Sequence, residues 1–136
     1  MNPAARYLWP LPVTLIGVVC VGAARIFGAR VALRGGVMEA CGGPLGAVLR
    51  RMYPPMPVSA ITLGHVVLAQ DESQLELTRV HERVHVRQYE RWGLFFPLAY
   101  LVASGIALLQ GREGYRDNVF EREADESSGP EMCGPC

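Results

Sequence analysis

The segment 81–85, which reads HERVH, restricts the possible folds of this chain more than any other feature. In a helix, residues four apart lie on one face about one turn apart, so both imidazoles of such a segment point the same way. Ser73 and Glu76 have the spacing of a capping box, and Gly93 is suited to a left-handed stop. No Pro or Gly lies between these signals. The sequence therefore predicts a helix that carries both histidines.

The two faces of this helix differ in character. One face carries apolar side chains together with the histidines, namely Leu77, His81, Val84, His85, Gln88 and Trp92. The opposite face carries Arg79, Arg83, Arg87 and Glu90. We therefore expect the arginines to face solvent and the histidines to point into the interior. Two such imidazoles can bind one Zn²⁺, with the Glu82 carboxylate close enough to act on a water at the metal.

A third ligand is available in the segment 121–125, which reads EREAD. On a helix, Glu121 and Asp125 lie one turn apart, so Glu121 can bind the metal while Asp125 accepts the N–H of a ligating imidazole. The alternative is a solvated acidic turn, because Glu123 and Glu126 belong to the same run.

The HExxH pattern at 81–85, followed by Glu-x-x-Ala-Asp at 121–125, resembles the gluzincin zinc metallopeptidases. The third ligand of that group is a Glu from a later helix, and the Glu-x-x-Ala-Asp spelling is closest to its membrane-embedded branch, the CAAX-prenyl and heat-shock-type peptidases. The strings HERVHVRQYERWG and YRDNVFEREAD are also similar to a family of small bacterial proteins with this spacing. The resemblance covers about residues 58–126, and its motifs concern the metal site, not a substrate.

The resemblance implies a zinc-dependent peptide hydrolase. Its implied metal ligands are His81, His85 and Glu121. Glu82 would be the general base that takes a proton from water and delivers it to the leaving amine. Asp125 would orient one imidazole. Tyr115 or Arg116 is placed by its position to act as the transition-state donor that such chemistry also needs.

A structural zinc site is the alternative interpretation. Cys133 and Cys136, together with His81 and His85, form a Cys₂His₂ set at spacings that zinc accepts. The protein would then be a non-catalytic, membrane-associated module. Glu82 favours the catalytic interpretation, because a structural site does not use a base beside its ligands. We expect the third histidine, His65, to be structural and leave it out of the site.

Two apolar stretches point towards a membrane. Residues 7–24 carry no charge and are open to three interpretations: a membrane anchor, a cleaved signal peptide and a buried core helix. Arg25, Arg30 and Arg34 follow the stretch and only Arg6 precedes it, so the positive-inside rule predicts a cytoplasmic location for the rest of the chain.

The second stretch, residues 92–111, also lacks charge. If it crossed a bilayer once, Glu121 and the two histidines would lie at opposite membrane faces and could not share a metal. We therefore predict that residues 94–109 form a core or in-plane helix that doubles back along the histidine helix. A short helix, capped by Asn118, would then return Glu121 to the site.

The remaining segments predict an α+β fold. Residues 31–43 read as a hairpin, residues 45–52 as a short helix, and residues 58–69 as one or two strands with a bend at Gly64. The expected fold is a small antiparallel sheet packed on the HExxH helix, an apolar helix and a short Glu-bearing helix, preceded by an N-terminal apolar helix.

The expected organisation of the chain is an apolar segment 1–30, a minimal domain 31–126 and a disordered tail 127–136. The 136 residues can bury one modest core. The chain has 13 basic and 13 acidic residues and no basic stripe interleaved with aromatics, which argues against a nucleic-acid partner. The expected partners are a peptide or protein substrate and a membrane, and the oligomeric state is left open.

Overall fold

A computed structural model of the chain describes residues 2–52 and 58–128. Its helices are α1 (Pro3–Leu8), α2 (Leu11–Ile26), α3 (Pro44–Arg51), α4 (Glu72–Trp92), the 3₁₀ turn η1 (Gly93–Phe95), α5 (Phe96–Leu109) and α6 (Val119–Ser128). Its strands are β1 (Arg30–Arg34), β2 (Val37–Cys41), β3 (Ala60–Leu63) and β4 (Val66–Ala69). The predicted α+β class is confirmed, as are the hairpin at 31–43 and the short helix that follows it.

The four strands form one mixed sheet in the order β1-β2-β4-β3. Both hairpins, β1–β2 and β3–β4, are antiparallel, but the central pair β2–β4 is parallel. The predicted antiparallel pairing is present within both hairpins, but the parallel central pair makes the sheet mixed. Each hairpin is specified locally by its turn residues, such as Gly64 with a φ of 63°. The pairing of one hairpin with the other is a long-range contact that no local pattern specifies.

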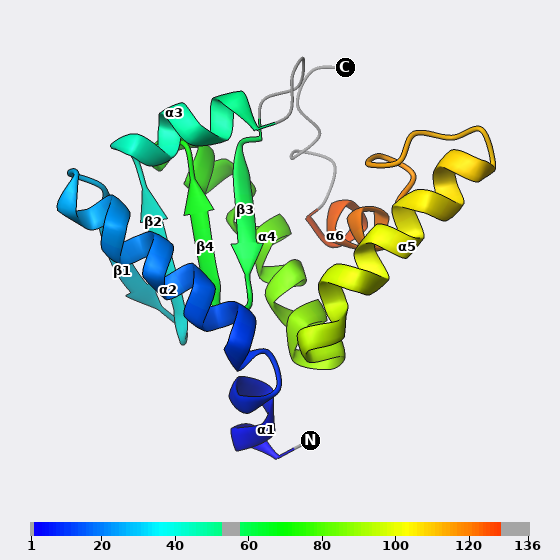
Figure 1. Cartoon of the computed structure of the whole chain (residues 1–136), viewed down its shortest axis with the longest axis horizontal. Helices are drawn as coiled ribbons and strands as arrows, with labels where there is room; N and C mark the ends of the chain where they lie inside the picture. The colour runs from blue at the N-terminus through cyan, green and yellow to red at the C-terminus, as the bar shows by residue number, and fades with distance from the viewer. Residues whose placement is uncertain (1, 53–57, 129–136) are drawn as a thin grey trace.

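Helices cover both faces of the sheet (Figure 1). On one face, Val21 and Ala24 of α2 pack with Val66 and Leu68 of β4. On the other face, Val67 and Ala69 of the same strand pack with Leu75 and Val86 of α4. Alternate residues of a strand point to opposite faces, and β4 is buried on both, which explains its continuous apolar run.

The N-terminal apolar segment is partly built into this core. Helix α2 buries Val13, Gly17, Val21 and Ala24, half-buries Thr14 and Cys20, and exposes its other residues. Gly17 lies against β4 so closely that an added Cβ would stand 2.7 Å from Cβ of Val66. The assignment of residues 1–30 as a membrane-anchor-like segment stays a prediction.

Helix α4 begins at a different cap from the one predicted. The side chain of Asp71 accepts a hydrogen bond from the backbone N of Gln74 at 2.9 Å, so Asp71 is the N-cap, and Ser73 lies in the first turn. The capping box of Ser73 with Glu76 is therefore wrong: Asp71 leaves strand β4 in the extended conformation that an N-cap requires. The predicted stop at Gly93 is confirmed, with a φ of 59°.

The outer face of α4 also differs from the prediction. Arg79 and Arg83 do not simply face solvent: both reach the buried carboxylate of Glu39 on β2, Arg83 with an N–O distance of 2.9 Å. A buried carboxylate is stable only when it is paired, and these two arginines supply the pairing together with Arg34, at 3.9 Å. Arg87 is exposed, as predicted.

The predicted reversal after α4 is present. The chain turns through η1, and α5 runs back so that Tyr100 contacts Glu121 on α6 (Figure 1). Pro97 lies in the first turn of α5, and the helix continues without interruption through Gly105. By length and composition alone, the helical run Glu72–Leu109 could cross a membrane: its most apolar window has a mean hydropathy of 1.8 and is 17% buried.

Candidate metal centre

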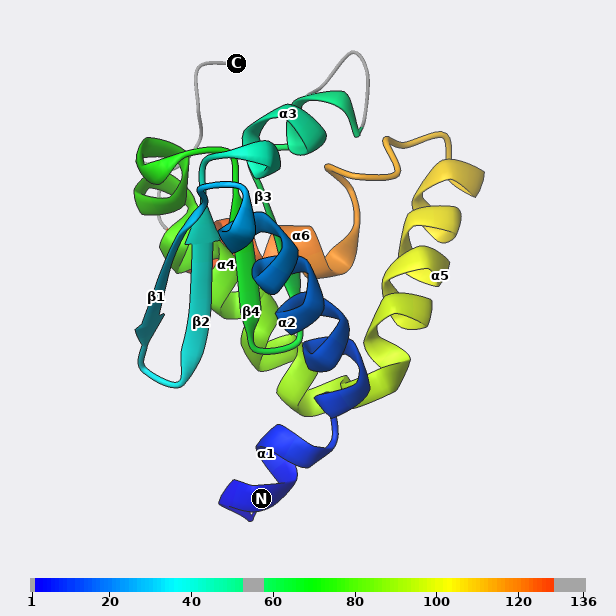
Figure 2. The same ribbon diagram turned by 60° about the vertical axis from the view of Figure 1, so that its left-hand side comes forward.

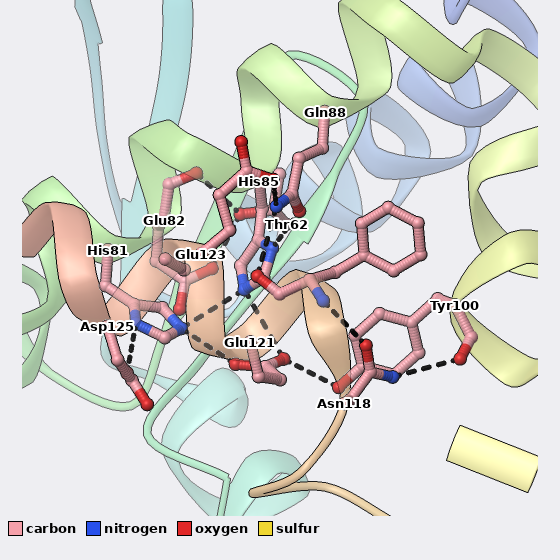
Figure 3. A network of polar contacts seen from close by, with 12 residues as sticks. Thr62, His81, Glu82, His85, Gln88, Tyr100, Asn118, Glu121, Glu123 and Asp125 are labelled. Atoms are coloured by element: carbon pink, nitrogen blue, oxygen red, sulfur yellow. Dashed lines mark hydrogen bonds and ion pairs between the residues drawn. The ribbon is translucent and has the colours of Figure 1, made fainter. Parts of the chain in front are cut away.

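Helices α4 and α6 pack against each other and bring three predicted ligands together (Figure 3). His81 and His85 project from α4, and Glu121 projects from α6. Nε2 of His81 lies 3.0 Å from Oε2 of Glu121 and 3.1 Å from Nε2 of His85. Nε2 of His85 lies 3.4 Å from Oε1 of Glu121. Glu121 and Ala124 are therefore buried against α4 and do not belong to a solvated turn, whereas Arg122 and Asp125 of the same segment are exposed.

The predicted cap of α6 places Glu121. Oδ1 of Asn118 accepts the backbone N–H of Phe120 at 2.9 Å, which caps the helix as expected. The Asn118 amide also donates to the backbone O of Tyr100 and to Oγ of Ser104, both on α5. Since Asn118 is fully buried, this one side chain fixes the start of α6 against α5.

Both imidazoles are oriented by a partner on Nδ1. Nδ1 of His81 lies 3.0 Å from Oδ1 of Asp125, the contact expected from the sequence. Nδ1 of His85 lies 2.8 Å from Oε1 of Gln88. The Gln88 amide nitrogen donates to the backbone O of Phe120 and to Glu123, so its oxygen must face His85. Each Nδ1 therefore carries a proton, and both Nε2 atoms are directed at Glu121.

The cluster shifts the pKa of its members in opposite directions. Burial alone would lower the pKa of His85, but the hydrogen bond to Glu121 and the charge of that carboxylate raise it to about 9. Burial alone would raise the pKa of Glu121, but hydrogen bonds from His81 and His85 lower it. Without a metal, a carboxylate and protonated imidazole therefore neutralise each other in the site.

The donor set fits a zinc ion. Four donors at ~2.0 Å from zinc in a tetrahedron stand about 3.3 Å from one another. Nε2 of His81 lies 3.0 Å from Oε2 of Glu121 and 3.1 Å from Nε2 of His85, both near that value, whereas the 3.4 Å separation joins Nε2 of His85 to the other carboxylate oxygen, Oε1. The three residues offer ligand atoms that all lie within 4.8 Å of one another. A metal could therefore take the place of the protons that these residues share.

Glu82 lies beside these ligands but is held by the sheet. Its Oε2 accepts a hydrogen bond from Oγ1 of Thr62 on β3 at 2.6 Å. Burial raises the pKa of Glu82, and the charge of His85 and the Thr62 hydrogen bond oppose only part of this rise. The carboxylate thus has one anchored oxygen and a pKa displaced towards neutrality, which suits a proton acceptor.

Besides Tyr115, a tyrosine that the sequence did not indicate contacts the ligands. The hydroxyl of Tyr100 donates to Oε1 of Glu121 at 2.6 Å, and burial together with the Glu121 charge raises its pKa, so it stays a donor. Burial raises the pKa of Tyr115, and the negative charges of Glu121, Glu82 and Asp125 and a hydrogen bond to Glu121 raise it further. Arg116 is exposed and pairs with Glu113.

The remaining candidate residues lie elsewhere. His65 is buried beside Tyr7, and its Nε2 lies 3.0 Å from Glu90, so it is outside the cluster. Cys133 and Cys136, the thiols of the alternative Cys₂His₂ site, lie outside the described residues.

Three contact residues were missed by sequence analysis. The position of Gln88 on the histidine face was a usable signal, since it lies one turn after His85. Thr62 and Tyr100 gave no such signal, because strand pairing and the helix reversal bring them to the site.

No protein-family model, curated protein or solved structure matches this chain. The geometry by itself establishes a His-His-Glu cluster that could hold a metal ion.

Proposed function

We propose that this protein is a zinc-dependent peptide-bond hydrolase of gluzincin type. The observation that carries the proposal is the convergence of His81, His85 and Glu121 with a fourth group, Glu82, beside them that is not a ligand. A structural metal site has no use for such a carboxylate. The resemblance of the two motifs to gluzincins is the second support, and the identity of the metal rests on the donor set.

The chemistry assigned to each residue follows from its contacts. A bound zinc ion would polarise the substrate carbonyl and lower the pKa of water to about 7. Glu82 accepts the water proton on the oxygen that Thr62 does not hold, and then delivers it to the leaving amine. Asp125 and Gln88 accept the Nδ1 protons and fix the direction of the two imidazoles, so that each Nε2 would offer its lone pair to a bound metal.

An extended peptide can be held at the free edge of β3. The backbone N of Gln70 bonds the O of Ser59, so the antiparallel alternation turns the backbone groups of Ala60 and Thr62 outwards. Among the described residues, β3 pairs with β4 alone. A substrate strand added at this edge would lie beside Thr62, whose side chain contacts the base. This connects substrate binding with the proton acceptor.

We further propose that the protein works at the cytoplasmic surface of a membrane. The exposed apolar surfaces of α2 and α5 and the arginines that follow α2 support this location.

The test of the hydrolase is Glu82→Gln, which keeps the size of the side chain but removes the proton acceptor. With a broad peptide library, hydrolysis should fall by about 10²–10⁴-fold while zinc stoichiometry and thermal stability hardly change. His81→Ala is the comparison variant, and it should lose both zinc and activity. Hydrolysis by Glu82→Gln at the wild-type rate would exclude this mechanism.

A further inference from the structure

One side of the molecule exposes apolar side chains on α2, η1 and α5, and we call it the α2–α5 face. Val19 is 72% exposed, Leu98 61% and Leu101 67%. Isolated apolar residues are normal on a protein surface, but a contiguous set on two helices marks an interaction surface.

Helices α2 and α5 meet where each begins, and they lie on the same side of the molecule. The rings of Trp9 and Phe95 lie 5.9 Å apart, and Trp9 packs on Gly93, so the start of α2 meets the start of α5. From this corner the helices diverge as a V, and both lie towards the viewer in Figure 1, in front of the sheet and α4. The turned view agrees with this arrangement (Figure 2). One flat surface can therefore contact both helices.

The geometry of α5 is suited to lying on a membrane, not to crossing it. Its 14 residues measure about 21 Å, less than the ~30 Å of a hydrocarbon core. Its middle is tied to the metal centre by the bond from Tyr100 to Glu121 and those from Asn118 to Tyr100 and Ser104. A helix that left the protein to span a bilayer would break these bonds. Only the outer side of α5 is free.

Charge favours an anionic lipid surface over a second copy of the chain. The segments 3–34 and 93–112 contain five arginines and no acidic residue, and three of these arginines, Arg6, Arg30 and Arg34, pair with carboxylates from other segments. Arg25 follows the apolar part of α2 and Arg112 follows α5, and neither has a carboxylate within 4.0 Å in the described chain. A symmetric dimer through this face would bring the same basic set against itself.

We infer that the α2–α5 face binds the headgroup region of an anionic phospholipid bilayer, with α2 and α5 parallel to the membrane plane. The inference extends the membrane location given under the proposed function and does not depend on zinc or on hydrolysis. Val19, Leu98 and Leu101 enter the interface, and Arg25 and Arg112 bind lipid phosphates at the two tips of the V.

Vesicle flotation of the full chain tests this inference. The protein is purified in mild detergent and diluted into vesicles of phosphatidylcholine alone or with one quarter phosphatidylglycerol. We expect binding to the anionic vesicles, release by alkaline carbonate as for a peripheral protein, and a blue shift of tryptophan fluorescence. The two tryptophans are built-in reporters, because Trp9 is 47% and Trp92 42% exposed near the shared corner.

Matched variants test the contribution of the exposed apolar side chains to vesicle binding. Leu98→Glu with Leu101→Glu should abolish flotation, whereas Leu77→Glu with Val80→Glu, at exposed positions on α4, should not. If the first pair loses its circular dichroism spectrum, Val19→Glu on α2 replaces it.

Arginine variants test the lipid charge. Arg25→Gln with Arg112→Gln should weaken binding to anionic vesicles about 30-fold, at about fivefold for each charge. Arg87→Gln with Arg122→Gln, on α4 and α6, should leave it unchanged.

Three results would overturn the inference. Equal binding to neutral and anionic vesicles would exclude a preference for anionic lipid. Retention on the vesicles after the carbonate wash would indicate a helix that spans the bilayer. A dimer in sedimentation velocity that Leu101→Glu dissociates would assign the face to a second copy. His81→Ala should float like wild type, because membrane binding does not require zinc. The flotation result can therefore be interpreted even if the proposed zinc site is wrong.

Discussion

Tyr100→Phe tests whether the tertiary contacts of the metal centre matter for zinc binding. The variant removes only the hydroxyl that donates to Oε1 of Glu121 at 2.6 Å and keeps the ring packed on Phe96 and Phe120. In the metal-free protein, Glu121 also has both histidines as partners. A bound zinc ion would take over the histidine nitrogens, which would leave the two tyrosines, Tyr100 at 2.6 Å and Tyr115, as hydrogen-bond partners of the carboxylate.

The expected change in the Kd for zinc follows from this difference between the metal-free and the zinc-bound protein. A hydrogen bond to a charged group contributes about 1.5–3 kcal/mol, and most of it should be lost from the zinc-bound form. Loss of a residue that orients a metal ligand usually weakens metal binding about 10–100-fold, which is about 1.4–2.7 kcal/mol and agrees with that range. The Kd for zinc should therefore rise by one to two orders of magnitude, with an unchanged stoichiometry.

The assay is competition for zinc with a chromophoric chelator at fixed pH. Tyr89→Phe is the matched control, because Tyr89 packs edge-on against Phe96 in the same aromatic cluster. Tyr115→Phe tests the tyrosine that the sequence favoured. A Kd within twofold of wild type for Tyr100→Phe would refute the assignment, and so would an equal loss of affinity in Tyr89→Phe, which would indicate a packing effect.

Three further predictions concern stability, pH and the tail. Asp71→Ala should lower the free energy of unfolding by ~1 kcal/mol in denaturant titrations, whereas Ser73→Ala should change it little, since Asp71 caps α4. In the metal-free protein, the raised pKa of His85 stabilises the fold below its usual value of 6.5, and this contribution is lost as pH rises through about 9. The lowered pKa of Glu121 stabilises it above 4.5, so thermal scans should show this contribution at its maximum between pH 4.5 and 6.5. Deletion of residues 129–136 should leave zinc stoichiometry unchanged and Glu121→Ala should lose zinc; the reverse pattern would indicate the Cys₂His₂ site.

The sequence by itself determined the parts of the protein that depend on local periodicity. Spacing of four placed His81 and His85 on one face of α4 and brought Asp125 within reach of His81, because a helix repeats nearly every four residues. The sharing of one metal site by α4 and α6 required the apolar stretch to reverse, and that argument predicted α5 correctly. Gly93 marked the reversal because few other residues adopt its φ.

The tertiary structure alone decided the contacts between segments distant in the chain. The parallel pairing of β2 with β4, the burial of Glu39 against Arg79 and the bond from Thr62 to Glu82 join residues 20 to 40 positions apart. Side-chain periodicity shows which face of an element is apolar, but not which other element covers it. Tyr100 was missed for this reason: its place at Glu121 depends on the angle at which α5 leaves η1, which is set by packing of the assembled core.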